Sequence, residues 1–309
     1  MKKLLLGTLL ILVAAAGALY FSPPTLLAGV QWVERQRAGL TLEEVKVGDL
    51  NIHYYAGGPR DGETLLLLHG FGANKDNWLR FARHFTGRYR VIALDLPGFG
   101  DSSKPDASYD VGTQSERIAA FAQALGVGKL HLVGNSMGGH IAALYAARHP
   151  DQVLSVALFD NAGVKSPQPS ELFQRLQRDE PNPLVVKTAE DFPRLMNFVF
   201  VEPPALPDSL KRHFAEQAMA NSAHYERIFT HLVERYIPLE PELPKIQAPT
   251  LLLWGDQDRA LHVSSIEVMQ PLLKNPSVVI MKNCGHVPMI ERPEETAAHY
   301  QRFLDQNKG

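Results

Sequence analysis

Six short runs of almost wholly apolar residues constrain the fold of this chain more than any other feature. They cover residues 65–68, 91–94, 131–133, 153–159, 250–254 and 278–281. A strand with one face in solvent alternates apolar with polar residues, so unbroken runs of this length are typical of strands buried on both faces. Helical patterns, for example at residues 115–125 and 140–148, lie between the runs. We therefore predict an α/β fold with a mostly parallel central sheet and helices on both faces.

Two segments depart from this alternation of strands and helices. Residues 45–54 alternate apolar with polar residues on both sides of Gly48-Asp49, which predicts a hairpin before the first parallel strand. Between residues 165 and 245, about 80 residues separate two adjacent strand candidates, and they are rich in Pro and in helical patterns. We interpret residues 165–245 as an insertion into a core built from residues 40–164 and 246–309.

The amino-terminal 39 residues contain a long apolar run. Lys2 and Lys3 precede 18 uncharged residues, 4–21, which as a helix would be about 27 Å long, close to the thickness of a bilayer's hydrocarbon core. The lysines would keep this end in the cytoplasm, so we expect a single-pass anchor with the rest of the chain on the opposite side, which in a bacterial protein is the periplasm. The alternative is a signal peptide cleaved near residues 14–18, which would release a soluble periplasmic or secreted protein. The apolar run continues past that point to Tyr20 and Phe21, which favours the anchor.

Between residues 26 and 33, the apolar residues Leu26, Leu27, Val30, Trp32 and Val33 recur near helical spacing. This pattern predicts either a juxtamembrane amphipathic helix or a leading helix packed on the core. Within the apolar run, Gly7, Ala14 and Ala18 fall near one helical face, and small residues at such spacing let two helices pack closely. The bilayer and a second copy of the chain, paired through the N-terminal helix, are therefore candidate partners.

Charge and cysteine content exclude other classes of function. The chain has 31 Lys and Arg against 33 Asp and Glu, without a basic run, so we expect no nucleic-acid partner. The single cysteine, Cys284, can form neither an internal disulfide nor a thiolate metal site. The H-E-x-x-H pattern is absent, and Asp256-x-Asp258 lacks the glycine and the final glutamate of a calcium loop. We therefore expect no metal and no other cofactor.

The strongest functional motif is GNSMG at residues 134–138, between a strand candidate and a helix candidate. In this context G-x-S-x-G is a nucleophile elbow, where Ser136 stands on a sharp turn and the glycines let strand and helix pack tightly. A serine hydroxyl is a weak nucleophile, so it needs a base, and the base needs an acid to orient it. The chain order Ser, acid, His assigns the base to His286, in the loop after the last strand candidate.

Three aspartates are candidates for the acid. Asp256 and Asp258 follow the strand candidate at residues 250–254, and Asp160 follows the one at residues 153–159. Parallel α/β sheets place their ligands at the carboxyl ends of strands, where all three aspartates lie. The residues alone do not distinguish between them.

A second glycine-containing loop, HGFG at residues 69–72, follows the strand candidate at residues 65–68. Its glycines let the backbone turn so that the amide of Phe71, together with that of Met137 just after the nucleophile, can point at a developing oxyanion. We expect His69 to hold this loop in place.

From about Leu40 to its end the chain resembles the α/β-hydrolase superfamily, and within it the capped serine esterases and lipases. The resemblance rests on residues 69–72, 95–100, 134–139, 254–258 and 285–286. In that family the acid usually occupies the last position of the W-G-x-x-D pattern, which implies Asp258, with Asp256 as second choice. Residues 95–100 are a structural loop in the family. With its N-terminal segment, the chain is similar to membrane-anchored bacterial lipases and closely to inner-membrane phospholipases A.

This resemblance implies a serine carboxylic-ester hydrolase, and the insertion would then be a helical cap. The cap contains six phenylalanines, of which some would line a pocket for a long acyl chain and most would form the cap's own core: Phe173, Phe192, Phe198, Phe200, Phe214 and Phe229. We expect acyl lipids as substrates, above all glycerophospholipids or lysophospholipids, and fatty acids as products. The alternatives are a small-ester or C–C bond hydrolase of the same fold and a non-catalytic ligand-binding protein.

Overall fold

The structure is a computed structural model that describes residues 7–8, 17 and 22–307. The predicted membrane span, residues 4–21, lies outside the described residues except at 7, 8 and 17, and so do Ala14 and Ala18 of the predicted pairing face. Within the part of the chain that is described, no helix is both long enough and apolar enough to cross a bilayer.

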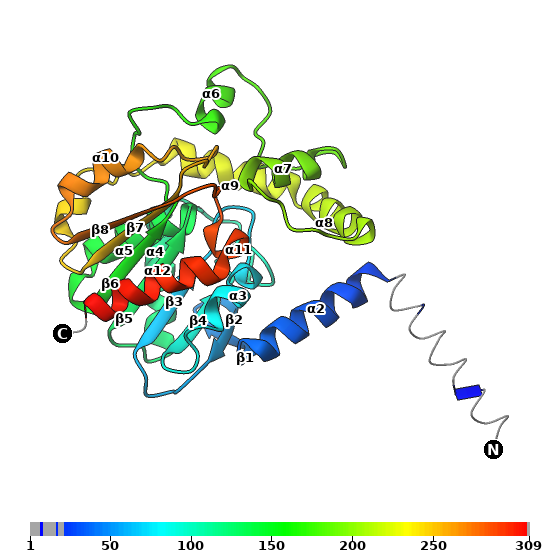
Figure 1. The fold of residues 1–309 in the computed structure, drawn as a ribbon, viewed down its shortest axis with the longest axis horizontal. Helices are drawn as coiled ribbons and strands as arrows, with labels where there is room; N and C mark the ends of the chain where they lie inside the picture. Colours follow the sequence, from blue (N-terminus) through cyan, green and yellow to red (C-terminus); the bar gives the residue numbers. More distant parts are fainter. Residues whose placement is uncertain (1–6, 9–16, 18–21, 308–309) are drawn as a thin grey trace.

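Eight strands of the described residues form one sheet, in the order β1-β2-β4-β3-β5-β6-β7-β8 (Figure 1). The first two, β1 (Leu40–Val47) and β2 (Leu50–Gly57), form the predicted hairpin, which turns at Gly48 with φ 59°. β2 pairs antiparallel with β4, and every later pair in the sheet is parallel, as predicted. The remaining strands are β3 (Thr64–Leu68), β4 (Arg90–Leu94), β5 (Leu130–Asn135), β6 (Val153–Phe159), β7 (Thr250–Gly255) and β8 (Pro276–Met281).

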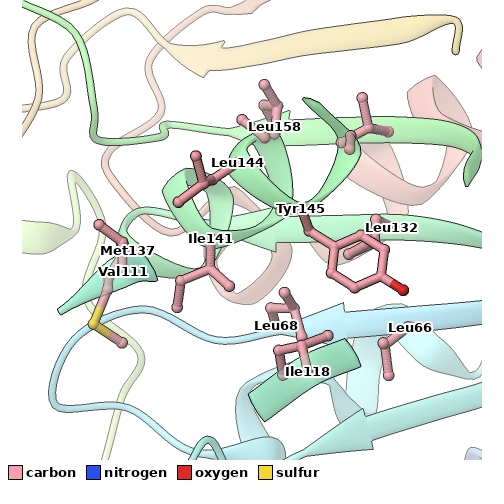
Figure 2. Close-up of a cluster of buried hydrophobic side chains, with 14 of the residues drawn as sticks. Leu66, Leu68, Val111, Ile118, Leu132, Met137, Ile141, Leu144, Tyr145 and Leu158 are labelled. Atoms are coloured by element: carbon pink, nitrogen blue, oxygen red, sulfur yellow. The ribbon is translucent and has the colours of Figure 1, made fainter. Parts of the chain in front are cut away.

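Helices cover both faces of the sheet, which explains the unbroken apolar runs. Leu66 and Leu68 of β3 pack with α4 (Val111–Ala124) and α5 (Met137–Arg148). Leu65 and Leu67, which point the opposite way, pack with α3 (Leu79–Ala82) and α12 (Pro293–Gln306). Figure 2 shows the first of these layers, with side chains of both helices against those of the strands. The leucines of β3 therefore face an apolar layer on both sides of the sheet.

The last strand differs from the prediction that all six apolar runs are buried on both faces. β8 is the edge of the sheet beside β7, and its Ile280 is 45% exposed. An edge strand has a neighbouring strand on one side only, so less of its surface is covered. The apolar composition of the run does not reveal that position.

The chain between β6 and β7 forms the helices that lie together at the top of Figure 1. These are α6 (Glu171–Gln177), α7 (Asp191–Val199), α8 (Asp208–Ala220) and α9 (Ser222–Glu234). The short helix η3 (Leu243–Lys245) follows them and packs against α5. Tyr225 of α9 stacks on Phe99, with ring centres 5.7 Å apart, and lies 5.8 Å from the ring of Phe71. Since Phe71 and Phe99 follow β3 and β4, this insertion lies over the carboxyl ends of the parallel strands.

The N-terminal helix α2 (Pro23–Arg37) packs against β1, α3 and α8, beside the insertion (Figure 1). Gln31 donates a hydrogen bond of 2.6 Å to Asp76 of the short helix η1 (Lys75–Trp78). The indole of Trp32 is 56% exposed. The helix therefore packs on the rest of the described chain with one face and leaves the other, which includes Trp32, in solvent. The other short helices are η2 (Pro150–Gln152), α10 (Ser265–Met269), η4 (Gln270–Leu272) and α11 (Pro288–Glu291).

Candidate active site

Ser136 stands on a strained turn between β5 and α5, with φ 56° and ψ −120°. Such a conformation costs a residue with a side chain about 1–3 kcal/mol and persists only where its surroundings enforce it. Here the Ser136 amide donates to the carbonyl of Phe159 at 3.0 Å, and its carbonyl accepts from the amides of His140 and Ala162, both at 3.1 Å. The structure therefore has the backbone geometry that the elbow motif predicts.

The glycines of the elbow make room for the neighbouring backbone. A Cβ on Gly138 would lie 2.3 Å from the carbonyl oxygen of Leu68 and 2.5 Å from that of His69. A Cβ on Gly134 would lie 2.3 Å from the carbonyl oxygen of Gly138. The start of α5 is thus packed directly on the end of β5 and on the loop after β3, which no side chain at these positions would allow.

His286 and Asp258 form a buried hydrogen-bonded pair. Nδ1 of His286 lies 2.8 Å from Oδ2 of Asp258. Since a carboxylate can only accept, Nδ1 is the donor, and Nε2 is the ring nitrogen left for another partner. The other oxygen of Asp258 accepts from the amides of Ala260 at 2.7 Å and Leu261 at 3.0 Å. The structure thus brings together the base and the acid that the sequence proposed.

The two other acid candidates have different surroundings. Asp256 accepts a hydrogen bond of 2.8 Å from the amide of Asn283 and lies 3.4 Å from Nζ of Lys282. Its carboxyl group therefore faces the turn after β8. Asp160 is fully buried, and a carboxylate oxygen of Asp160 lies within 4.8 Å of the facing atoms of both Asp258 and His286.

Asn135, the variable residue before the nucleophile, contributes a contact that the sequence did not suggest. Its side-chain amide donates to the carbonyl of Phe159 at 3.1 Å and to that of His286 at 2.9 Å. It therefore links the histidine loop to the ends of β5 and β6. A polar side chain at the end of a buried strand was the available signal, because a buried amide must find hydrogen-bond partners.

Glu291 is a second residue that sequence reasoning missed. Its Oε2 accepts from the amide of Gly285 at 2.8 Å, and its Oε1 accepts from the amides of Val201 at 3.0 Å and Glu202 at 2.8 Å. It therefore joins the loop of His286 to the insertion. An acid in the apolar sequence of α11 was the only hint.

The HGFG loop is held by two hydrogen bonds of the His69 ring. Nδ1 of His69 donates to the carbonyl of Gly70 at 2.8 Å, and its Nε2 accepts from the amide of Leu96 at 3.0 Å. Burial lowers the pKa of His69, so this ring stays neutral and holds the loop. Among the described residues, no acceptor takes the amide of Phe71. The amide of Met137 is the first of α5, where the helix itself offers no partner.

A cavity of about 760 Å³ lies between α2, the loop after β3 and the helices α7, α8 and α11. Gly72 of the HGFG loop, Tyr225 of α9 and Met289 of α11 are among its lining residues. Only two of the six cap phenylalanines, Phe192 and Phe214, line it. The others pack elsewhere or are exposed: Phe229 packs on Phe71, Phe198 and Phe200 are buried in other clusters, and Phe173 is half exposed.

Known proteins resemble the chain over most of its length. Lipase 1 of Psychrobacter immobilis is 37% identical over 274 residues, which cover 87% of this chain and 86% of that lipase. Monoacylglycerol lipase abhd6-B of Xenopus laevis is 32% identical, over 96% of this chain and 92% of its own. Among solved structures, a bacterial membrane phospholipase A described as a virulence factor superimposes with a TM-score of 0.92 at 68% identity, covering 99% of each chain.

The family comparison agrees with this geometry. The family described as having the alpha/beta hydrolase fold matches residues 63–293, from just before β3 to the start of α12. The matched segment includes the serine elbow, the HGFG loop, the insertion and the histidine loop. The chain therefore belongs to the α/β-hydrolase family, among its capped serine esterases and lipases.

Proposed function

We propose that this chain hydrolyses the ester bonds of acyl lipids through a covalent acyl-enzyme on Ser136. The observation that carries the proposal is the buried pair of His286 and Asp258 at the carboxyl ends of the parallel strands, where the strained Ser136 also lies. Lipases, a monoacylglycerol lipase and a membrane phospholipase A among the relatives support the lipid-ester class. The chain is on this basis a carboxylic-ester hydrolase.

The proposed reaction has two acyl-transfer steps. Nε2 of His286 takes the proton of the Ser136 hydroxyl, whose oxygen attacks the acyl carbonyl, while Asp258 orients the ring and stabilises its positive charge. The amides of Phe71 and Met137 stabilise the oxyanion, and each such donor is typically worth about 10²- to 10³-fold in rate. The leaving alcohol takes the proton from His286. Water, deprotonated by the same nitrogen, then releases the fatty acid and restores the serine.

Within acyl lipids, we assign glycerophospholipids or lysophospholipids as substrates. The cavity beside the oxyanion loop has apolar walls from Leu27, Phe192 and Phe214, which suit an acyl chain. Polar side chains also line it, among them those of Lys104 and Gln217, which suit the polar end of a lipid. The 68% identity to a membrane phospholipase A supports this narrower assignment.

The division of the chain that goes with this function is threefold. Residues 1–39 form a membrane anchor and juxtamembrane helix, residues 40–164 and 246–309 form the catalytic core, and residues 165–245 form a helical lid. The 18 uncharged residues after Lys2 and Lys3 and the exposed Trp32 of α2 support the membrane-facing part. We place the protein in the bacterial inner membrane with its catalytic core in the periplasm.

Membrane fractionation tests this placement. Without Lys2 and Lys3 the chain has 29 basic against 33 acidic residues, so electrostatic attraction to anionic lipids does not hold it. We expect the protein to stay with membranes in high salt and at alkaline pH and to keep its N-terminus. Recovery of a shortened, soluble form would instead support the cleaved signal peptide.

Pairing of the N-terminal helices through Gly7, Ala14 and Ala18 is part of the same proposal. Chemical cross-linking in intact membranes should give a dimer that Gly7→Ile weakens. Detection of monomer alone would contradict it.

The activity itself is tested with purified full-length protein and extracted membrane lipids, with products identified by mass spectrometry. We expect free fatty acid and lysolipid from the wild type, none from Ser136→Ala, and unchanged release from Ser166→Ala, a serine of the insertion. A fluorophosphonate probe should label the wild type and not Ser136→Ala. Hydrolysis of short soluble esters without lipid products would favour the small-ester alternative, and the absence of labelling would favour a non-catalytic protein.

A further inference from the structure

Asp160 lies at the carboxyl end of β6, beside the end of β7. Its side chain is fully buried, and its backbone has φ 45°. The Asp160 amide donates to the carbonyl of Leu253 at 3.0 Å, and its Oδ1 accepts from the amide of Gly255 at 2.9 Å. Three residues beyond Gly255 is Asp258, the proposed acid of the triad. These contacts hold the Asp160 carboxyl group next to that acid, away from solvent.

The second oxygen of this carboxyl group has no hydrogen-bond donor. Oδ2 of Asp160 is buried and makes no hydrogen bond to any described residue. The titratable groups that face Asp160 are Asp258 and His286, in the cluster within 4.8 Å, together with Glu291 and Cys284. Two ionised carboxylates so close together in a buried site would repel each other, so one of them must hold a proton.

The hydrogen bonds around the two carboxyl groups indicate which one holds the proton. Asp258 accepts from two backbone amides and from His286, and these three contacts favour its ionised form. Asp160 accepts from one amide. Burial and the neighbouring charge of Asp258 also raise the pKa of Asp160 well above its usual value. A protonated Asp160 has one donor to offer, and the Asp258 carboxylate beside it is an acceptor.

We propose that Asp160 carries a proton on Oδ2 and donates it as a hydrogen bond to the Asp258 carboxylate, which holds that acid in place against His286. Asp160 is then a positioning residue, because it acts on the reaction through Asp258. Its role in turnover rests on the proposed function, whereas its protonation does not.

Substitution by Asn separates this role from that of a charged group. Asn matches a protonated Asp in shape: its carbonyl oxygen can accept from Gly255, and its amide can donate to Asp258. Leu has a similar size and neither ability. If Asp160 were ionised and acted as the acid, Asp160→Asn would be as harmful as Asp160→Leu.

The kinetic test compares these two variants with Asp256→Asn, whose carboxyl group faces the Asn283 turn, on a soluble acyl ester across pH 5 to 9. We expect kcat within about threefold of the wild type for Asp160→Asn, and a loss of about 10- to 100-fold for Asp160→Leu with little change in KM, the effect of removing one hydrogen bond to a charged group. The pH at which kcat/KM reaches half its maximum should move in Asp160→Leu alone. Equal losses in Asp160→Asn and Asp160→Leu would overturn the proposal.

A measurement without turnover covers the case in which Asp160→Leu fails to fold. Infrared spectra of the full chain at pH 7 should contain the carbonyl band of a buried protonated carboxyl group, absent from Asp160→Asn and retained in Asp256→Asn. The lack of such a band in the wild type would overturn the proposal whatever the enzyme hydrolyses. Activity that survives in Ser136→Ala would instead contradict the proposed function and leave the infrared result intact.

Discussion

The backbone amide of His286 donates a hydrogen bond of 2.8 Å to the carbonyl oxygen of Val199, the last residue of α7. The insertion is thereby attached directly to the loop that carries the proposed base. Glu291 reinforces the attachment, because its carboxylate accepts from Gly285 on one side and from Val201 and Glu202 on the other. Displacement of the end of α7 would therefore displace His286 as well.

Replacing Glu291 tests how strongly this attachment supports the site. Glu291→Ala leaves the amides of Gly285, Val201 and Glu202 without their acceptor, so we expect the free energy of unfolding to fall by about 2–4 kcal/mol. We also expect kcat to fall, since the position of His286 is no longer enforced. Urea unfolding and ester hydrolysis measure the two effects. Glu234→Gln, an exposed residue at the end of α9, is the control, and an Ala variant at position 291 that matched it in both assays would refute the coupling.

The buried ion pair of Lys75 and Asp95, close in sequence to the HGFG loop, gives a second prediction. Nζ of Lys75 lies 2.7 Å from Oδ2 of Asp95, with their side chains 5% and 0% exposed, and also 2.7 Å from Oδ2 of Asp101. Burial alone would lower the pKa of Lys75, but the two carboxylates outweigh it and raise that pKa. Lys75 is therefore charged and compensates the otherwise isolated charge of Asp95.

Lys75→Met should lower the free energy of unfolding by about 3–5 kcal/mol, because it leaves the Asp95 carboxylate buried without a cation. Adding Asp95→Asn to Lys75→Met should recover part of that loss, since the uncompensated charge is then removed. A double-mutant cycle by urea unfolding gives the interaction energy. Additive effects of the two substitutions would show that the pair is not coupled.

The central strands were predictable because burial on both faces makes consecutive residues of a strand apolar. The edge position of β8 was not, since it depends on the order of strands in the sheet and not on the composition of residues 278–281. The antiparallel hairpin of β1 and β2 was predictable from the alternation around Gly48. Local patterns therefore predicted the strands and their type, and tertiary structure decided where each strand lies.

The same distinction holds for the candidate site. The elbow of Ser136 and the loop of His286 follow from local motifs, whereas Asp256 and Asp258 are alike in sequence and differ only in what the turn after β7 makes them face. Asn135 contacts a residue 151 positions away in the chain, and Glu291 contacts one 90 positions away. Neither partner can be identified from the sequence around the residue itself.

His140 gives a prediction about acid stability. Its Nε2 donates to the carbonyl of Ile237 at 2.7 Å, and burial lowers its pKa from 6.5 to about 4. The unfolded chain then binds a proton at a higher pH than the folded protein, so this residue destabilises the fold as the pH falls from 6.5 toward 4. Between pH 7 and pH 5 its contribution amounts to about 2 kcal/mol.

Urea unfolding of the wild type and of His140→Leu at pH 7 and pH 5 isolates this contribution. The variant lacks the titrating ring, so it should lose about 2 kcal/mol less stability than the wild type over that interval. At pH 7 it should be the less stable of the two, because the carbonyl of Ile237 loses its donor. If both proteins lost the same stability on acidification, His140 would not be a buried neutral ring.

Asp160 predicts the opposite dependence on pH, in the alkaline direction. Burial and the neighbouring charge of Asp258 raise its pKa in the fold well above 3.8, so between the ordinary and the raised pKa the folded protein holds a proton that the unfolded chain has released. Unfolding then releases a proton, and this part of the stability falls as the pH rises above the ordinary pKa of an aspartate.

Asp160→Asn has no such proton. The free energy of unfolding of the variant, minus that of the wild type, should therefore increase by about 1.4 kcal/mol per pH unit until the pH reaches the raised pKa. Urea unfolding at pH 5 and pH 7 measures this difference, with Asp256→Asn as the control variant. A constant difference for Asp160→Asn as well would mean that Asp160 is already ionised in the folded protein.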